Sequence, residues 1–308
     1  MTEENQLSEP ISFDGQVAVI TGAGGGLGRT YALELARRGA RVVVNDLGST
    51  VDGSGASTSA ADQVVAEITE AGGEAVASYD SVSSEEGGAA IVQTALDAFG
   101  TVDIVVNNAG ILRDKSFGNM TVPEVDAVLD VHLRGAFHVT LPAWQVMKEK
   151  GYGRLVFTSS AAGLFGNFGQ ANYGAAKMGL VGLSNVLAVE GAKYGILSNA
   201  VAPIARTRMT EDILGPFAEL VAPEKVTPLV VYLCSEACET THGIFTVGGG
   251  RYGRVFIGTN RGWFSGQDGM PSVEEISDHL EEITDISEYI VPSNVNEETA
   301  LFAQMLAG

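Results

Sequence analysis

Apolar positions follow two alternating patterns along most of the chain. Short apolar runs lie at residues 16–20, 41–45, 74–79, 102–106, 153–158 and 196–200. Nearly continuous runs of this length are typical of strands buried on both faces of a parallel sheet. Between the runs, apolar residues recur at helical spacing, as Leu27, Tyr31 and Leu35 do after the first. Strands and helices that alternate in this way predict an α/β fold with a doubly wound parallel sheet.

The same patterns divide the chain into three parts. Residues 1–14 are polar and acidic, which predicts a flexible N-terminal arm, and residues 15–250 contain no linker and predict one domain. Residues 251–308 form a C-terminal extension in which residues 255–257 are expected to form an edge strand. In this extension Ser272-Val-Glu-Glu275 has the pattern of a capping box that opens a helix with an apolar stripe. A second short helix is expected near Leu301–Leu306. The apolar stripes of these two helices are expected to pack on their own domain, and the alternative is that they cap the substrate entrance or contact another subunit.

Composition and charge exclude several classes of partner. The formal charge of −20 disfavours nucleic acids and anionic membranes, and no apolar run approaches the roughly 20 residues of a membrane span. Two cysteines without a disulfide framework indicate a cytoplasmic location. Cys234, Cys238 and His242 follow one another at intervals of four, which raises the question of a metal site. Buried structural thiols explain the two cysteines better, so no metal is expected.

A glycine-rich turn follows the first predicted strand. Thr21-Gly-Ala-Gly-Gly-Gly-Leu27-Gly28 runs directly into the first predicted helix. Glycines let the backbone approach a pyrophosphate, and the N-terminus of a helix favours negative charge. Gly22, Gly26, Leu27 and Gly28 are therefore predicted to bind a dinucleotide in a Rossmann-type domain, although the spacing is G-x-x-x-G-x-G.

The second predicted strand ends at Asp46, eighteen residues after Gly28. A carboxylate here is placed to accept hydrogen bonds from the adenosine ribose and would repel a 2′-phosphate, which predicts NAD rather than NADP. An ordinary turn residue is the alternative interpretation of Asp46. Residues 47–58 are low in large side chains and are expected to form a flexible insertion.

A candidate catalytic pair follows the fifth predicted strand. Tyr173 and Lys177 are four residues apart, so on a helix they lie on one face. A lysine there would lower the pKa of the tyrosine, which could then act as a general acid or base. Ser160 is available to hold the same substrate oxygen. A surface pair on a helix is the alternative for an isolated Y-x-x-x-K pattern.

Together these motifs resemble the short-chain dehydrogenase/reductase family. The matching stretches are Thr21–Gly28, Asn107-Asn-Ala-Gly110, Ser160 and Tyr173–Lys177. The resemblance implies that Tyr173 transfers a proton, Ser160 holds the substrate oxygen and Lys177 binds the nicotinamide ribose. It places Asn108, Ala109, Gly110, Asp80, Ser81 and Pro203 in the cofactor site.

Within the family the chain is most similar to the (3R)-hydroxyacyl-CoA dehydrogenase domains of multifunctional enzymes, which are also known as 17β-hydroxysteroid dehydrogenases. Asn107–Asp114, Val131–Gly135 and Phe165–Tyr173 carry this likeness. His132 stands where the family has an asparagine that anchors a water, and it either keeps that role or packs in the helix. Ile204 and Arg206 also depart from the family pattern and leave the substrate open.

The sequence therefore predicts an NAD-dependent oxidoreductase that interconverts a secondary alcohol and a ketone. A (3R)-3-hydroxyacyl-CoA is the favoured substrate, and a hydroxysteroid, a 3-oxoacyl thioester or a catalytically inactive dinucleotide sensor are the alternatives. A homodimer or homotetramer is expected. Arg113, Lys115, Arg206 and Arg208 are candidates to bind CoA phosphates, unless they pair with nearby carboxylates.

Overall fold

The computed structural model describes residues 10–207, 219–267 and 269–307. The chain divides into two units, Met1–Arg254 and Val255–Gly308. Most of the predicted N-terminal arm lies outside the described residues. Phe13, near the end of that segment, is buried in the core of the first unit.

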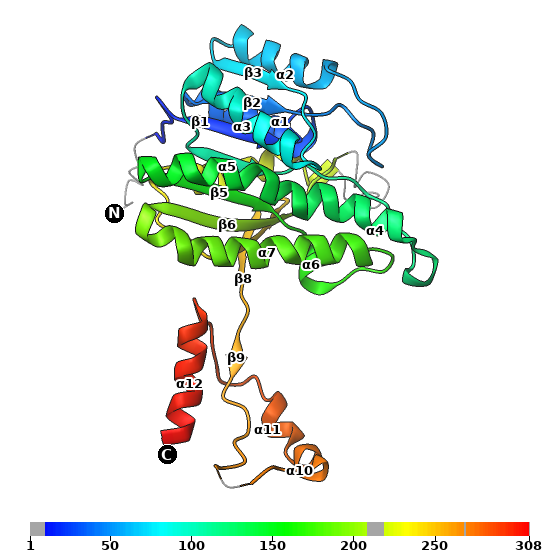
Figure 1. The fold of residues 1–308 in the computed structure, drawn as a ribbon, viewed down its shortest axis with the longest axis vertical. Coiled ribbons are helices and arrows are strands. Elements are labelled where there is room, and N and C mark those ends of the chain that lie inside the picture. The colour runs from blue at the N-terminus through cyan, green and yellow to red at the C-terminus, as the bar shows by residue number, and fades with distance from the viewer. Residues whose placement is uncertain (1–9, 208–218, 268, 308) are drawn as a thin grey trace, which may run out of the picture. The chain divides into compact units, whose positions relative to one another are not determined.

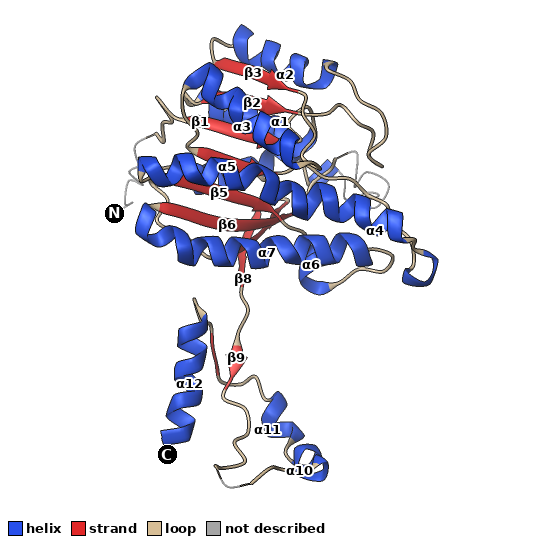
Figure 2. Ribbon diagram, viewed as in Figure 1, coloured by secondary structure: helices blue, strands red, loops and turns tan. Residues whose placement is uncertain are grey.

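One eight-stranded sheet forms the centre of the first unit, in the order β3-β2-β1-β4-β5-β6-β7-β8 (Figures 1 and 2). The strands are β1 (Val17–Thr21), β2 (Arg41–Asn45), β3 (Glu74–Ser78), β4 (Ile104–Asn107), β5 (Gly153–Thr158), β6 (Ile196–Pro203), β7 (Gly243–Gly248) and β8 (Arg251–Val255). All pairings from β3 to β7 are parallel. The strand order reverses at β1, which is where open α/β sheets bind ligands. The predicted doubly wound fold is confirmed.

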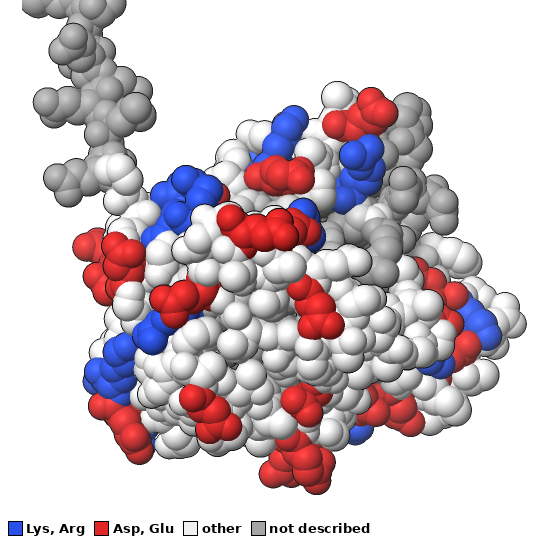
Figure 3. All heavy atoms as spheres, turned by 90° about the horizontal axis from the view of Figure 1, so that it is seen from above, with Lys and Arg blue, Asp and Glu red and all other residues white. Residues whose placement is uncertain are grey.

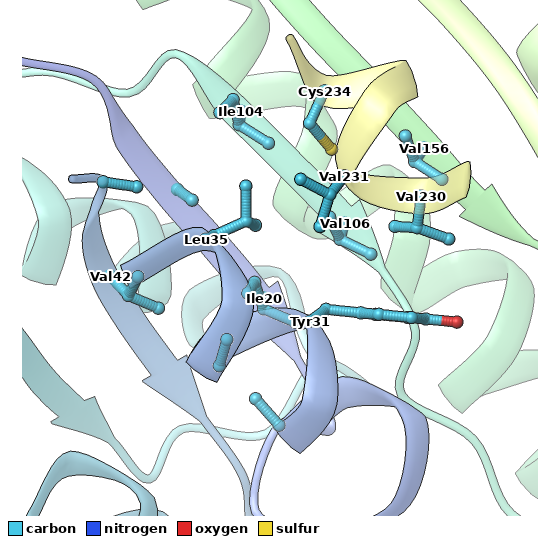
Figure 4. Close-up of a cluster of buried hydrophobic side chains, with 14 of the residues drawn as sticks. Ile20, Tyr31, Leu35, Val42, Ile104, Val106, Val156, Val230, Val231 and Cys234 are labelled. Atoms are coloured by element: carbon cyan, nitrogen blue, oxygen red, sulfur yellow. The ribbon is translucent and has the colours of Figure 1, made fainter. Parts of the chain in front are cut away.

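Helices cover both faces of this sheet. One apolar cluster joins α1 (Gly26–Arg37), α2 (Ser59–Glu70) and α9 (Thr227–Cys234) to the sheet; the other joins α3 (Glu85–Phe99), α5 (Gly135–Lys150) and α7 (Ala171–Gly191). In β1, Ala18 and Ile20 belong to the first cluster and Val17 and Val19 to the second. Alternate residues of a strand point to opposite faces, so a continuous apolar run is needed where both faces are covered. Figure 4 shows Tyr31 of α1 among the side chains of the first cluster.

The helical segment between β4 and β5 is interrupted. The chain forms α4 (Val122–Leu129), a π-helical turn over Asp130–Arg134 and then α5. Pro123 and a capping box between Thr121 and Glu124 begin this segment, and Gly151, with a φ of 72°, ends it. π-helical turns are uncommon and often mark functional sites. This one carries His132, which is buried.

β7 and β8 form a hairpin joined by Gly249 and Gly250. Their φ angles are 60° and 91°, and two adjacent residues with positive φ are typical of a type I′ turn. The edge strand therefore occupies Arg251–Val255, and the prediction that placed it at residues 255–257 is wrong by several positions. Apolar pattern alone did not locate it, because β8 contains two arginines and a glycine.

The second unit contains small elements. They are β9 (Thr259–Asn260), α10 (Val273–Asp278), α11 (Leu280–Thr284), β10 (Tyr289–Ile290) and α12 (Val295–Ala307). The capping box of Ser272 and Glu275 is confirmed, but α10 ends before His279 and the predicted helix continues as α11. No side chain among the described residues of this unit is buried. Its ring contacts include Trp263 stacked on His279 with centroids 4.2 Å apart.

Charged side chains are interspersed on the face shown in Figure 3. Acidic groups there alternate with basic ones and do not leave a broad basic surface. Binding to nucleic acid requires a basic patch or stripe, which this face does not have.

Candidate active site

The glycine turn after β1 is shaped for close approach to a ligand. Gly22 has a φ of 65°, and a Cβ at this position would lie 2.8 Å from the Cα of Ala109. Gly26 begins α1 with a φ of 52°, and no acidic residue occupies the first turn of that helix. The amides of the first helical turn therefore face the turn without a carboxylate partner, which suits a phosphate anion.

Asn108 holds this turn in place from the end of β4. Its side-chain nitrogen donates to the backbone oxygens of Thr21 and Gly22 at 3.0 and 3.1 Å. The hydroxyl of Thr21 accepts hydrogen bonds in return from the amides of Asn108 and Ala109, both at 3.0 Å. Asn108 thus positions the turn and also lines the cavity beside it.

Asp46 lies at the carboxyl end of β2 with both carboxylate oxygens engaged. Oδ2 accepts from the amide of Gly24 at 2.8 Å, and Oδ1 accepts from the amide of Gly48 at 2.7 Å. Each carboxylate oxygen has a further lone pair to offer a diol. Asp80 lies at the end of the neighbouring strand β3, where its backbone oxygen accepts from Asn45 at 2.9 Å.

A cavity of about 560 Å³ runs from these strand ends to the catalytic candidates. Every predicted cofactor or catalytic residue lines it except Gly28. Gly28 is buried under the turn, where an added Cβ would lie 2.3 Å from the backbone oxygen of Gly22. The volume, the glycine cradle and the free helix amides fit a dinucleotide.

The catalytic candidates meet at one end of this cavity. Ser160 follows β5 and caps α6 (Ala161–Phe165), whereas Tyr173 and Lys177 lie one turn apart on α7. The Ser160 hydroxyl lies near enough to the Tyr173 phenol to lower its pKa. The Lys177 ammonium lies 5.4 Å from the centre of the Tyr173 ring and donates to the backbone oxygen of Thr158 at 2.6 Å. The sequence therefore identified three side chains that the fold brings together.

The pKa of Tyr173 is raised, whereas the sequence predicted that Lys177 would lower it. Burial raises the pKa of Tyr173, and the nearby Ser160 hydroxyl offsets this only in part. The expected lowering by Lys177 is absent because burial lowers the pKa of Lys177 itself to about 7. Near neutral pH the lysine is thus only partly charged and is a weak electrostatic partner for the phenolate.

His132 lies beside the catalytic tyrosine. Its ring meets that of Tyr173 edge to face, with centroids 5.1 Å apart. Nε2 lies 3.0 Å from the amide nitrogen and 2.8 Å from the oxygen of Ile111, whereas Nδ1 is buried without a partner. Burial and the nearby Lys177 charge hold the pKa of His132 well below its usual value, so the ring is neutral. Both predicted roles, water anchor and packed side chain, stay open.

The basic residues near the site have partners that the sequence did not indicate. Lys115 forms an ion pair with Glu124 at 2.6 Å, and Arg113 donates through Nε to the backbone oxygen of Asp52 at 3.1 Å. Arg206 is exposed, and Arg208 lies outside the described residues. Ile204 is exposed and does not line the cavity.

The two cysteines are buried as free thiols. Because α9 ends at Cys234, Cys238 and His242 do not continue its helical spacing as the sequence suggested. Within residues 10–207, 219–267 and 269–307, no three His, Cys, Asp or Glu side chains gather as potential metal ligands.

A comparison with protein families identifies the family of the chain. The family model described as short chain dehydrogenase matches residues 16–214. The chain belongs to the short-chain dehydrogenase family. It is therefore an oxidoreductase, and members of this family bind NAD or NADP.

Relatives of this short-chain dehydrogenase include three informative proteins. A Mycobacterium tuberculosis protein named as a short-chain type dehydrogenase/reductase is 57% identical over 273 residues, which cover 88% of this chain and 95% of that protein. The mouse peroxisomal multifunctional enzyme type 2 is 50% identical over 302 residues, covering 97% of this chain but 41% of that enzyme. A hydroxyacyl-CoA dehydrogenase of M. tuberculosis is 41% identical over 268 residues, covering 81% of this chain and 83% of its own length.

A solved structure agrees with this placement. The full-length peroxisomal multifunctional enzyme type 2 of Drosophila melanogaster superposes with a TM-score of 0.81 at 38% identity, covering 96% of this chain and 50% of that chain. The short-chain dehydrogenase thus spans half or less of the two multifunctional enzymes compared here. The predicted resemblance to this group is confirmed. No helix among the described residues is long and apolar enough to cross a membrane.

Sequence reasoning missed part of the lining of the cavity. Five residues of the predicted insertion line it: Leu47, Ser49, Thr50, Val51 and Gly53. Thr158 and Ser159 also line it from the end of β5, and Thr158 supplies the oxygen that Lys177 binds. The position of Thr158 at the carboxyl end of a predicted strand was the available signal.

Proposed function

We propose that the protein is an NAD-dependent dehydrogenase that oxidises a secondary alcohol, with a (3R)-3-hydroxyacyl-CoA as substrate. The observation that carries the proposal is one cavity with Asp46 at one end and Ser160, Tyr173 and Lys177 at the other. Gly22 and Gly26 would hold the pyrophosphate between these ends. The dinucleotide, when bound, supplies the hydride acceptor at C4 of its nicotinamide.

The residues of the chain would handle the oxygen and its proton. The substrate hydroxyl would lie between the Ser160 hydroxyl and the Tyr173 phenol, which line the same cavity. During oxidation the phenolate form of Tyr173 accepts the hydroxyl proton, and during reduction the phenol returns it to the ketone oxygen. Lys177 is buried and one turn away, so it is placed to bind the nicotinamide ribose and to favour the phenolate when charged.

The substrate class is argued from the relatives. One relative is named a hydroxyacyl-CoA dehydrogenase, and two are named multifunctional enzymes. A 17β-hydroxysteroid or a 3-oxoacyl thioester as substrate is the alternative within the same chemistry. A sensor without turnover is disfavoured, because it needs no proton-transfer group such as Tyr173 beside Ser160 and Lys177 in the cavity. Assembly as a homodimer or homotetramer and a cytoplasmic location remain predictions.

The test is a substrate panel with NAD and NADP. Absorbance of the reduced nicotinamide is followed while (3R)- and (3S)-3-hydroxyacyl-CoAs of several chain lengths and 17β-hydroxysteroids are added. Turnover of the (3R)-thioester with NAD is expected. A protein that turns over only steroids, or that binds the dinucleotide and oxidises nothing, would contradict the proposed substrate or activity respectively.

Asp46 is expected to set the preference for NAD. Its carboxylate would accept hydrogen bonds from the ribose diol and repel a 2′-phosphate. The dissociation constant of NADPH divided by that of NADH should therefore be about tenfold or more smaller in Asp46→Ala than in the wild type. Calorimetric titration of wild type and variant measures the ratio. A Glu70→Ala variant, which removes an exposed carboxylate at the C-terminal end of α2, provides the control. Equal affinity of the wild type for both dinucleotides would contradict this role for Asp46.

A further inference from the structure

The insertion after β2 crosses the mouth of the cofactor cavity. It leaves the end of β2 at Asp46 and leads to α2, and its middle reaches the segment that follows β4 (Figure 1). In the sheet, β1 lies between β2 and β4. A loop that begins at β2 and touches the segment after β4 therefore passes the carboxyl end of β1, where the glycine turn begins. Residues from both the loop and the turn line the same cavity.

Three contacts fasten the tip of this loop. The amide of Leu112 donates to the oxygen of Val51 at 2.9 Å. Arg113 donates through Nε to the oxygen of Asp52 at 3.1 Å. Gly53 packs on Ile111, whose side chain is buried and would lie 3.1 Å from a Cβ at position 53. The tip is thus held by main-chain groups and one arginine, with few apolar contacts to keep it closed.

The base of the loop is closed around Gly48. The amide of Ser57 donates to the oxygen of Leu47 at 2.9 Å. Gly48 has a φ of 69°, and a Cβ there would lie 1.9 Å from the oxygen of Ser57. The amide of Gly48 also donates to Asp46 Oδ1 at 2.7 Å. Only glycine fits this position, and the same residue that closes the loop holds the carboxylate expected to bind the ribose.

We propose that residues 47–57 form a strap over the dinucleotide that slows its release and, through Gly48, fixes Asp46 toward the adenosine ribose. The proposal rests on the proposed cofactor site. Release of the dinucleotide requires the tip to leave residues 111–113, which breaks two hydrogen bonds. Rotation about Gly48, Gly53 and Gly55, which all have positive φ, permits that motion at low cost.

The test compares two glycines of the strap in the full-length protein. Gly48→Ala collides with Ser57, whereas Gly55→Ala meets no atom within 4 Å although its φ of 75° imposes similar backbone strain. Stopped-flow fluorescence measures the rate at which excess NAD displaces bound NADH, and equilibrium fluorescence gives the dissociation constants of NADH and NADPH. Gly48→Ala is expected to raise both the NADH release rate and its dissociation constant about tenfold or more, and to narrow the preference for NADH over NADPH. Gly55→Ala should stay within about twofold of wild type.

A second pair of variants leaves the backbone of the strap unchanged. Arg113→Ala removes one tie of the tip, and Lys115→Ala removes the same charge two residues away without touching the strap. Arg113→Ala should raise the NADH release rate about fivefold and Lys115→Ala should not. This pair decides the question if thermal unfolding finds Gly48→Ala misfolded.

Two results overturn the strap. One is an NADH release rate in Gly48→Ala equal to that in Gly55→Ala; the other is equal rates in Arg113→Ala and Lys115→Ala. A different result would contradict the proposed function. A wild-type protein that binds neither NADH nor NADPH would contradict both the proposed cofactor site and the strap. Normal binding of NADH to the wild type, together with equal NADH release rates in each pair of variants, would contradict the strap alone.

Discussion

Replacing Tyr173 with phenylalanine is expected to lower kcat about a thousandfold while NADH binds almost as in the wild type. Phenylalanine keeps the ring that contacts His132 and removes only the hydroxyl that exchanges the proton. The dinucleotide keeps its glycine turn, Asp46 and Lys177, so its dissociation constant should change little. Steady-state kinetics and NADH fluorescence measure the two effects separately.

Two further variants sharpen this experiment. Ser160→Ala should lower kcat less, about a hundredfold, because the serine orients the oxygen but does not take the proton. Tyr194→Phe, in the short helix Ala192–Tyr194 after α7, removes a hydroxyl away from the cavity and should leave kcat unchanged. A Tyr173→Phe enzyme with more than about a tenth of wild-type kcat would contradict the role given to this residue.

Lys177→Ala should reduce both turnover and dinucleotide binding. The lysine is expected to bind the nicotinamide ribose and to favour the phenolate, so one change removes two interactions. We expect kcat to fall about a thousandfold and the NADH dissociation constant to rise about tenfold. Fluorescence titration and initial rates test this, with Lys193→Ala on the exposed short helix as the control.

A Lys177→Ala protein that loses turnover but binds NADH normally would restrict the lysine to the proton step. The comparison with Tyr173→Phe is informative for that reason. The two variants share the expected loss of kcat and differ in the expected change of NADH affinity. Thermal unfolding of each variant excludes a general loss of the fold.

The sequence predicted most of the fold where apolar spacing and local capping agree. Helix α3 follows this rule: it begins after the Ser84 cap and ends at Gly100 with a φ of 79°. Tyr173 and Lys177 were placed on one helical face by their spacing alone, and the structure puts them there. Such features depend on neighbours within a few residues, so the sequence carries them directly.

Features that depend on distant contacts were not predictable in this way. The π-helical turn at Asp130–Arg134 shifts the hydrogen-bond register without changing the apolar pattern. The insertion after β2 is predicted to be flexible because it lacks large side chains, and its hydrogen bonds to Leu112 and Arg113, about sixty positions along the chain, could not be predicted from the pattern. The pKa of Tyr173 was misjudged because the burial of Tyr173 itself and of Lys177 cannot be read from spacing.

The burial of Lys177 also affects how stability depends on pH. Its side chain is 3% exposed, and its pKa falls from 10.5 to about 7 on folding. Between these two values the unfolded chain binds one proton more than the folded chain, so the free energy of unfolding should rise with pH. Below pH 7 the lysine is protonated in both states, and the full penalty of a buried ammonium applies.

Lys177→Met keeps a similar volume and removes that penalty. The variant should therefore be more stable than the wild type, and its advantage should be about 2 kcal/mol smaller at pH 9 than at pH 7. Urea unfolding at the two pH values measures the difference, and an advantage independent of pH would contradict the lowered pKa. A residue expected to serve both catalysis and dinucleotide binding would then be one that weakens the fold at neutral pH, so variants selected for thermal stability alone should tend to lose it.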